Sequence, residues 1–421
     1  MDDPAKPPLT IGIVALHALP AVDPACGGAI GGTETRAWTF ARGLAAAGHQ
    51  VRFLVRSNGE SFERDTDGVR VVGHRDRWHD RYVRVGRLIN REDGRLRLRR
   101  WSLDLLTTLP LVAAHRLWTR RRDRSQSFFD ASTADCWLTL GVQATSEAVI
   151  SSAHAADRRC GLLLGCDADV DDWFDHEPER QTPYGDRGRT CAAILRGADG
   201  IVTQTEWQRQ TLRDRYGRES VVIGNPIDLE HWQPSTAADG TPFVLWVGRA
   251  EPVHKRPIEA VTIAAACPEV PFKMVMNAAD PATAAAVRAA CPANCELIDF
   301  VPPDEMPNLM ARATLLLNTS SVEGFPNVFL QAAASGTPIV SQQVLGDWLA
   351  DSGAGRCGDG SVATAAAIVR DLIASADARD AHATAGRQYV ARHHQLGDRV
   401  DELAAFCRNT LLKPAEAADA S

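Results

Sequence analysis

Along the chain, short runs of consecutive apolar residues alternate with segments in which apolar residues recur at helical spacing. Runs of consecutive apolar residues at 11–16 and 51–55 predict buried strands. Between these runs, apolar residues recur at helical spacing, which predicts a helix over 34–47 that ends at Gly48. The alternation continues to about residue 220 and is typical of a doubly wound α/β domain with a parallel sheet.

The alternation breaks near residue 221 and then begins again. A polar stretch at 235–241 predicts a linker, and a second series of strands and helices follows it. The predicted boundaries are 1–230 for a first Rossmann-like domain, 231–242 for the linker, 243–395 for a second Rossmann-like domain, and 396–421 for a helix that crosses back to the first domain and a tail. Two such sheets place a ligand in the cleft between them, at the carboxyl ends of their strands.

The composition, 45% hydrophobic and 24% charged over 421 residues, is that of a soluble globular protein and excludes disordered, collagen-like and coiled-coil chains. No apolar run reaches the roughly 18 to 20 residues of a membrane-spanning helix. Residues 1–8 lack the basic flank and apolar core of a secretion signal. The ten cysteines are scattered, mostly in apolar stretches, which predicts free thiols in the cytoplasm and no metal site.

Positive charge is concentrated in one segment. Residues Arg75 to Arg124 hold fifteen arginines and six acids, a net charge of +9, so the remainder of the −7 chain carries −16. Its middle, Trp101 to Trp118, is apolar. Arginines beside an apolar, Trp-bearing stretch fit an anionic membrane surface or a lipid-linked acceptor. A solvated helical face, or a lip that meets an acidic acceptor, fits equally well, whereas no motif supports nucleic acid as a partner.

A first candidate site lies at the start of the second domain. A strand ends at Val247, and the loop that follows carries Arg249 and Lys255 before Pro257 opens a helix. Two cations beside a helix N-terminus suit a dense anion such as a diphosphate. Arg249 can bind two oxygens with its planar guanidinium, and Lys255 supplies a point charge.

A second candidate site spans a complete strand, loop, helix and strand at 315–340. Glu323 lies in the loop, where it could accept hydrogen bonds from sugar hydroxyls, and Gln331 lies on the helix. Pro326 marks the start of the helix. The amides expected to point into the cleft belong to Gly324, Phe325 and Asn327.

Together these motifs resemble those of the retaining GT-B glycosyltransferases of family four. The pattern is Arg249 six positions before Lys255, and Glu323-Gly-Phe325 eight positions before a polar helix residue. The resemblance extends to Gly31-Gly-Thr-Glu34 before the first helix and to Asn225-Pro-Ile-Asp228 before the linker. It covers most of the chain.

The resemblance implies a retaining, hexosyltransferase-like enzyme with its acceptor on the N-terminal domain and a nucleotide-sugar donor on the C-terminal domain. It implies that Arg249 and Lys255 neutralise the donor diphosphate, that Glu323 holds the transferred sugar, and that Gly31 and Gly32 let the backbone approach the diphosphate. The acceptor would be a glycan, a lipid-linked molecule or a small molecule. No metal or cofactor is expected, and the enzyme would be cytoplasmic or peripheral at the inner face of the membrane.

Two residues depart from the family pattern. Gln331 stands where the family usually has a second Glu that contacts the ribose, so nucleotide recognition is expected to be altered rather than lost. Family members also often place a histidine after a first-domain strand, near the reacting sugar. Here the comparable strand runs into Cys166-Asp167, which makes Asp167 the acceptor-side candidate.

Other functions remain open at this stage. Asp167-Ala-Asp169 also matches the metal clamp of the other glycosyltransferase fold. The glycines at 27–32, with Arg56 after the second strand, suggest an NADP-dependent oxidoreductase, although the compact G-x-G-x-x-G turn is absent. Gln331 also fits a non-catalytic nucleotide-sugar or lipid-binding relative, and a nucleotide-sugar epimerase could use the same two-domain scaffold.

Overall fold

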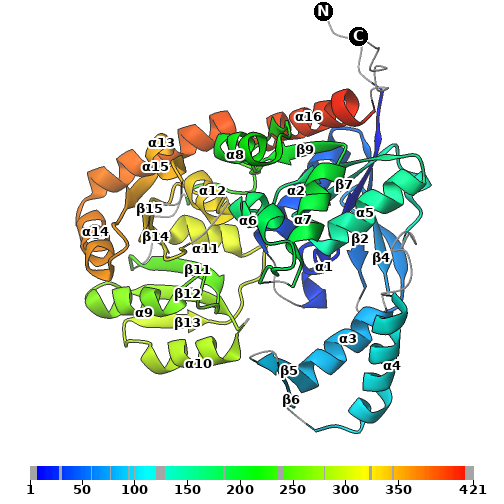
Figure 1. Cartoon of the computed structure of the whole chain (residues 1–421). Coiled ribbons are helices and arrows are strands. Elements are labelled where there is room, and N and C mark those ends of the chain that lie inside the picture. Colours follow the sequence, from blue (N-terminus) through cyan, green and yellow to red (C-terminus); the bar gives the residue numbers. More distant parts are fainter. Residues whose placement is uncertain are drawn as a thin grey trace, which may run out of the picture.

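The computed structural model contains two α/β lobes, one built around a mainly parallel sheet and the other around a parallel sheet (Figure 1). It describes residues 7–27, 31–57, 59–75, 77–92, 95–98, 101–119, 129–183, 185–235, 241–278, 280–321, 325–343 and 346–412. The two parallel sheets confirm the predicted α/β class. Among these residues, no helix has both the length and the apolar character needed to cross a membrane.

The N-terminal lobe holds an eight-stranded sheet in the order β10-β9-β8-β7-β1-β2-β4-β3. The neighbouring strands pair in parallel, except β3, which pairs antiparallel with β4. The strands are β1 (Thr10–Val14), β2 (Gln50–Arg56), β3 (Phe62–Thr66), β4 (Val69–His74), β7 (Cys136–Leu140), β8 (Arg159–Leu163), β9 (Gly200–Thr203) and β10 (Val221–Val222). The helices are α1 (Leu19–Val22), α2 (Gly32–Ala46), α5 (Ala144–Ala155), α6 (Trp173–His176), α7 (Gly188–Gly197) and α8 (Glu206–Tyr216), with short 3₁₀ turns η1 (Pro24–Cys26), η2 (Ala131–Thr133) and η3 (Asp167–Val170).

The C-terminal lobe holds a six-stranded parallel sheet in the order β13-β12-β11-β14-β15-β16. Its strands are β11 (Val244–Arg249), β12 (Phe272–Asn277), β13 (Cys295–Ile298), β14 (Leu315–Asn318), β15 (Ile339–Ser341) and β16 (Gly355–Cys357). Its helices are α9 (Pro257–Ala266), α10 (Pro281–Ala290), α11 (Met306–Arg312), α12 (Asn327–Ala334), α13 (Trp348–Ser352), α14 (Val362–Ala374) and α15 (Ala376–His393).

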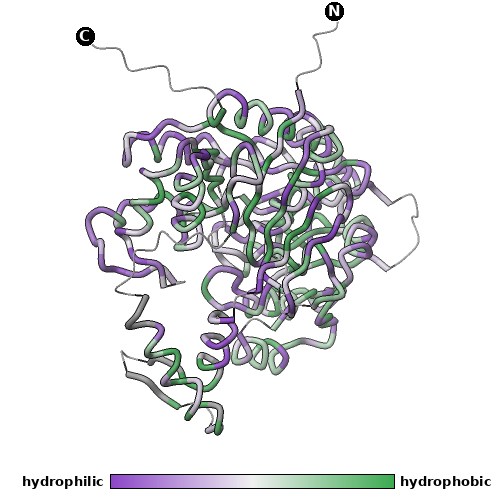
Figure 2. Tube along the Cα trace, turned by 90° about the vertical axis from the view of Figure 1, so that its right-hand side faces the viewer, coloured by the Kyte–Doolittle hydropathy of each residue, from purple (hydrophilic) through white to green (hydrophobic). Residues whose placement is uncertain are grey.

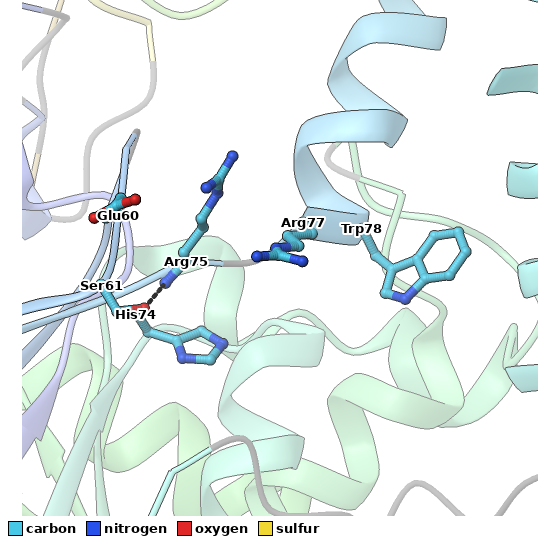
Figure 3. Close-up of a pocket in the computed structure, with 6 residues that line it drawn as sticks. All are labelled: Glu60, Ser61, His74, Arg75, Arg77 and Trp78. Atoms are coloured by element: carbon cyan, nitrogen blue, oxygen red, sulfur yellow. Dashed lines mark hydrogen bonds between the residues drawn. The ribbon is translucent and has the colours of Figure 1, made fainter. Parts of the chain in front are cut away.

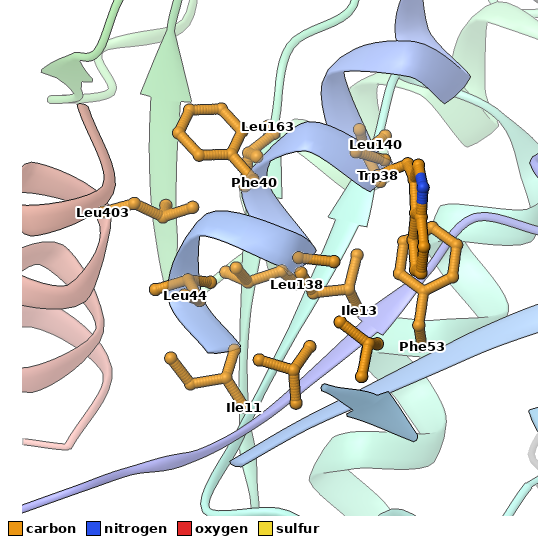
Figure 4. Close-up of a cluster of buried hydrophobic side chains, with 14 of the residues drawn as sticks. Ile11, Ile13, Trp38, Phe40, Leu44, Phe53, Leu138, Leu140, Leu163 and Leu403 are labelled. Atoms are coloured by element: carbon orange, nitrogen blue, oxygen red, sulfur yellow. The ribbon is translucent and has the colours of Figure 1, made fainter. Parts of the chain in front are cut away.

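The first core lies between α2 and the strands β1, β2 and β7 (Figure 4). The ring of Trp38 on α2 meets the ring of Phe53 on β2 edge to face, with centroids 5.2 Å apart. Leu403 also joins this core, although it lies on α16 (Leu396–Phe406), near the end of the chain. The helix α16 and the π-helical turn η4 (Cys407–Leu411) therefore pack on the N-terminal lobe. The exact domain limits inferred from the sequence, at residues 230, 242 and 395, remain predictions.

An extension of the N-terminal lobe separates β4 from β7. It consists of α3 (Arg77–Leu88), β5 (Ile89–Glu92), β6 (Arg95–Leu98) and α4 (Asp104–Thr119). The strands β5 and β6 form an antiparallel pair of their own. In Figure 1 this extension projects away from both sheets, and we call residues 77–119 the arm. The sequence showed an apolar stretch between arginines here, but it did not predict a projecting hairpin.

Candidate functional site

Arg249 is the last residue of β11 and is half-buried at the carboxyl end of the strand. Its side chain makes no hydrogen bond or ion pair with any residue that the structure describes. The loop that follows is organised by Glu251, whose carboxylate accepts from the amides of Val253 and His254 (2.7 Å each) and Lys255 (3.3 Å). Although burial opposes ionisation of Glu251, these three bonds outweigh it and lower its pKa. The loop between Arg249 and Lys255 is thus held in one conformation.

This loop passes directly into a helix. Arg256 adopts a left-handed backbone conformation (φ 50°), and Pro257 then begins α9. The side chain of Arg256 pairs with Glu259 on the first turn of that helix. Lys255 therefore stands one residue before the turn that opens α9, as the sequence predicted for a cation beside a helix N-terminus.

The loop after β14 packs against the Lys255 loop. The hydroxyl of Thr319 donates to the carbonyl of Lys255 (2.8 Å). The amide and hydroxyl of Ser321 donate to the carbonyls of His254 (2.8 Å) and Val253 (2.7 Å). These bonds bring together the two candidate sites found in the sequence. The predicted residues Glu323 and Gly324 lie outside the described residues, immediately after this junction.

Three further predicted residues lie at the start of α12 or on it. The ring of Phe325 packs against the rings of His394 and Trp348, with centroids 5.1 and 5.9 Å away. Pro326 is buried as the N-cap of α12, which places the helix start where the sequence predicted it. Gln331 is half-buried, and its side-chain amide makes no hydrogen bond with the described part of the chain.

Asn327 joins the two lobes. Its side-chain amide donates to the carbonyl of Gly32 on α2 (2.7 Å), and its side-chain oxygen accepts from Asn225 (2.7 Å). A Cβ on Gly32 would stand 3.0 Å from this Asn327 nitrogen, and a Cβ on Gly31 would collide with the carboxylate of Glu34. A side chain at either position would therefore displace Glu34 or press on Asn327. Their predicted approach to a diphosphate is a separate proposal.

Asp167 begins η3, beyond the carboxyl end of β8. Its carboxylate accepts from the side chain of Gln208 (2.8 Å). The side-chain amide of Gln208 also contacts the side-chain oxygen of Gln204 (3.4 Å), and the side-chain amide of Gln204 donates to Asn225 (3.1 Å). Burial raises the pKa of Asp167 to about 6, well above that of a solvent-exposed carboxyl. A continuous chain of side-chain contacts thus connects Asp167 to the contact between the lobes.

Asp169 has a different role from Asp167. It is buried, and its carboxylate accepts from the backbone amides of Gly165 (2.6 Å), Val142 (3.1 Å) and Cys166 (3.3 Å). Because these amides saturate it, Asp169 does not form with Asp167 the paired clamp that a metal would need. In the described parts of the chain, no group of three His, Cys, Asp or Glu side chains is arranged to hold a metal ion.

Two polar residues near this site were not singled out from the sequence. His17 follows β1 and lines a cavity of about 30 Å³ with Thr33, Glu34 and Gln143. Burial and nearby Arg56 lower the pKa of His17, so its imidazole is neutral at pH 7. Its position directly after the first strand was the signal that could have identified it.

Arg36 is the second of these residues and lies buried on α2. Its guanidinium donates to the carbonyl of Leu164 (2.6 Å) and contacts that of Ile223 (3.5 Å). Burial lowers its pKa to about 9, while the charge of Asp169 opposes that change. Arg36 therefore ties α2 to the ends of two strands and has a structural role.

Comparisons with known proteins identify two family models. The model described as "Glycosyl transferases group 1" matches residues 241–375, and the model described as "Glycosyltransferase Family 4" matches residues 30–126. The first match contains Arg249, Lys255 and the α12 region, and the second begins next to Gly31. A search of curated proteins found no match.

Solved structures resemble the chain over nearly its whole length. Sucrose-phosphate synthase from Thermosynechococcus elongatus matches with a TM-score of 0.66 and 15% identity, covering 95% of this chain and 98% of that one. HepE of Anabaena, solved in complex with UDP and glucose, matches with a TM-score of 0.63 and 16% identity, covering 95% and 100%. A glycosyltransferase from Rickettsia africae matches with a TM-score of 0.64 and 12% identity, covering 97% and 100%. These matches confirm the predicted GT-B fold.

Proposed function

The chain belongs to the group 1 glycosyltransferases, and we propose that it moves a hexosyl unit from a nucleotide-diphosphate sugar to an acceptor hydroxyl with retention of anomeric configuration. The observation that carries this proposal is the position of half-buried Arg249 at the end of β11. Among the described residues it has no partner, although the loop beside it is fixed by Glu251 and Thr319. A cation beside a fixed loop, with no anionic partner among the described residues, suits a substrate diphosphate.

In this proposal Arg249 and Lys255 bind the diphosphate and stabilise the negative charge that grows on it as the sugar leaves. Glu323 would hold hydroxyls of the transferred sugar. The amides of Gly324, Phe325 and Asn327 would contact the sugar and the phosphates. Gln331 would contact the ribose. Gly31 and Gly32 would allow the backbone of the N-terminal lobe to approach from the other side.

The transfer step makes one bond and breaks one. The acceptor oxygen bonds the anomeric carbon on the face from which the diphosphate departs, and the bond from that carbon to the diphosphate oxygen breaks. The acceptor proton passes to a phosphate oxygen of the leaving group. Asp167, with its pKa of about 6, would orient the acceptor hydroxyl from the N-terminal lobe. The acceptor would be a glycan, a lipid-linked molecule or a small molecule.

The comparisons with known proteins and the state of the cysteines support this proposal. HepE, a structural neighbour, was solved with UDP and with UDP-glucose, which makes a nucleotide sugar the first donor to test. Family membership also favours transfer over the oxidoreductase and epimerase alternatives. All ten cysteines are free thiols, which is consistent with a reducing compartment such as the cytoplasm.

The test is a screen of nucleotide sugars against the purified chain. A bound donor should raise the unfolding midpoint, and without acceptor it should be hydrolysed slowly to a nucleoside diphosphate. The exposed Arg288→Ala variant, which removes only a surface pair with Asp299, serves as a matched control for Arg249→Ala. Binding without any hydrolysis would instead favour the non-catalytic relative, and failure to bind any nucleotide sugar would contradict the proposal.

We also propose that the reaction needs no metal, because Arg249 and Lys255 supply the two positive charges that a divalent cation would otherwise bring to the diphosphate. Hydrolysis of the donor should therefore persist in EDTA. Loss of hydrolysis in EDTA, restored by Mg²⁺ or Mn²⁺, would contradict this part of the proposal.

A further inference from the structure

The arm is a folded hairpin with its own internal contacts. The helix α4 buries Leu105, Thr108 and Val112 on the side that packs against α3. The ring of His115 on α4 stacks on the ring of Trp78 on α3, with centroids 3.8 Å apart, and its Nδ1 is 2.9 Å from the hydroxyl of Tyr82. One side of α4 therefore has a partner within the arm.

The rest of the α4 surface is apolar and exposed. Between Asp104 and His115 the helix carries no charged residue. Leu106 on the helix is 65% exposed, and Leu103 and Trp101, just ahead of the helix, are 70% and 64% exposed. Leu109 and Leu111 on α4 are also exposed, as is Leu98 at the end of β6. A helix that is apolar on nearly all sides is normally buried, so the outer face of α4 needs a partner that the described chain does not supply.

Charge indicates which partner fits. The segment Arg75 to Arg124 carries +9, while the rest of the chain carries −16. Arg77 and Arg84 on α3 are exposed. An anionic surface would attract the arm and repel the remainder, which orients the molecule with the arm toward that surface. A neutral apolar partner would not interact with this separation of positive and negative charge.

The base of the arm adds a place for an anionic group. A cavity of about 590 Å³ lies where β4 leads into α3, lined by Glu60, Ser61, His74, Arg75, Arg77 and Trp78 (Figure 3). The backbone amide of Arg75 donates to the hydroxyl of Ser61 (3.1 Å), which fixes this turn. Both arginine side chains border the open space in Figure 3, as a lipid headgroup phosphate would require.

We propose that the arm docks on a membrane surface that contains anionic lipid. The exposed leucines of α4 and Trp101 enter the boundary between headgroups and acyl chains, and the surrounding arginines contact lipid phosphates. The arm projects from the lower edge of the molecule in Figure 2, so it reaches such a surface without obstruction by either lobe. This inference goes beyond the glycosyl transfer proposed above and does not depend on it.

The test is flotation of the full chain with vesicles of phosphatidylcholine alone or with about one third phosphatidylglycerol. Binding should require the anionic lipid and should fall at least tenfold between 0.1 and 0.5 M salt, because salt screens the arginines. The double variant Leu103→Asp/Leu106→Asp should lose at least tenfold in binding. Both side chains are exposed, so the unfolding midpoint should not change. The matched control is Trp207→Asp, which alters a 53% exposed apolar residue on α8 and should bind as the unaltered chain does.

Three outcomes would overturn the proposal. The first is no binding to anionic vesicles, and the second is equal binding to neutral vesicles. The third is a dimer that the leucine double variant converts to a monomer without any vesicle binding, which would assign the surface to a second copy of the chain. Donor hydrolysis is measured separately, so vesicle binding by a chain that hydrolyses no donor would contradict the proposed function and leave the docking inference standing.

Discussion

The side-chain amide of Asn327 donates a 2.7 Å hydrogen bond to the carbonyl of Gly32, so the first residue of α12 is joined to the first residue of α2. These two helices start beyond the carboxyl ends of β14 and β1, one in each lobe. Asn225 supports the contact by donating to the Asn327 oxygen (2.7 Å). The contact therefore fixes the separation of the two helix N-termini between which the proposed diphosphate would lie.

Replacing Asn327 by Ala should loosen this contact. The change removes two hydrogen bonds and leaves the amide of Asn225 without its partner, at a cost of about 1 kcal/mol for each bond. We expect donor hydrolysis to fall roughly tenfold, measured as turnover per folded molecule. Asn294→Ala is the control, because its amide bonds only carbonyls within the C-terminal lobe. It should lower stability without this loss of turnover, and equal losses in both variants would contradict the role of the contact.

Arg249→Ala and Lys255→Ala should each lower turnover by roughly a hundredfold. Loss of one preorganised donor to developing charge typically costs about 2.7 to 4 kcal/mol in the transition state. Arg249→Lys should recover part of the activity, because it keeps the charge but loses the two-pronged geometry. Steady-state kinetics with a saturating donor measures the effect. Near-normal turnover in both alanine variants would contradict the diphosphate assignment.

Much of the site's framework could be predicted from local sequence. Pro257 begins a helix where the local pattern predicted it, whereas β11 runs two residues past the predicted end at Val247, so that Arg249 ends the strand instead of lying in the loop. The bridge from Asn327 to Gly32 could not be predicted, because it joins residues 295 positions apart through one rotamer of a short side chain. The arm shows the same limit. Its apolar and basic residues were visible in the sequence, but whether the leucines faced a core or solvent depended on tertiary packing.

Gln331→Glu should preserve or strengthen donor binding. A carboxylate accepts hydrogen bonds from two ribose hydroxyls more strongly than an amide oxygen does, and the Gln331 side chain has no partner in the described chain that the change would disturb. Calorimetric titration with a nucleoside diphosphate measures the dissociation constant. Gln233→Glu, on the exposed chain before β11, controls for the added charge. Complete loss of binding in Gln331→Glu alone would mean that the ribose contact is misplaced.

Asp167 should make the stability of the protein depend on pH. Burial raises its pKa from 3.8 to about 6 in the folded state, so the folded chain holds this proton more tightly than the unfolded chain does. The ionised carboxyl therefore destabilises the fold progressively as pH rises from about 4 to 6, and the penalty is constant above that range. Asp167→Asn removes it, so the variant should gain relative to the unaltered chain over this window, by up to about 2 kcal/mol after allowance for partial exposure. Denaturant unfolding at pH 4.5 and pH 7.5 measures the difference. A gain that is the same at both pH values would mean that Asp167 has an ordinary pKa in the folded protein.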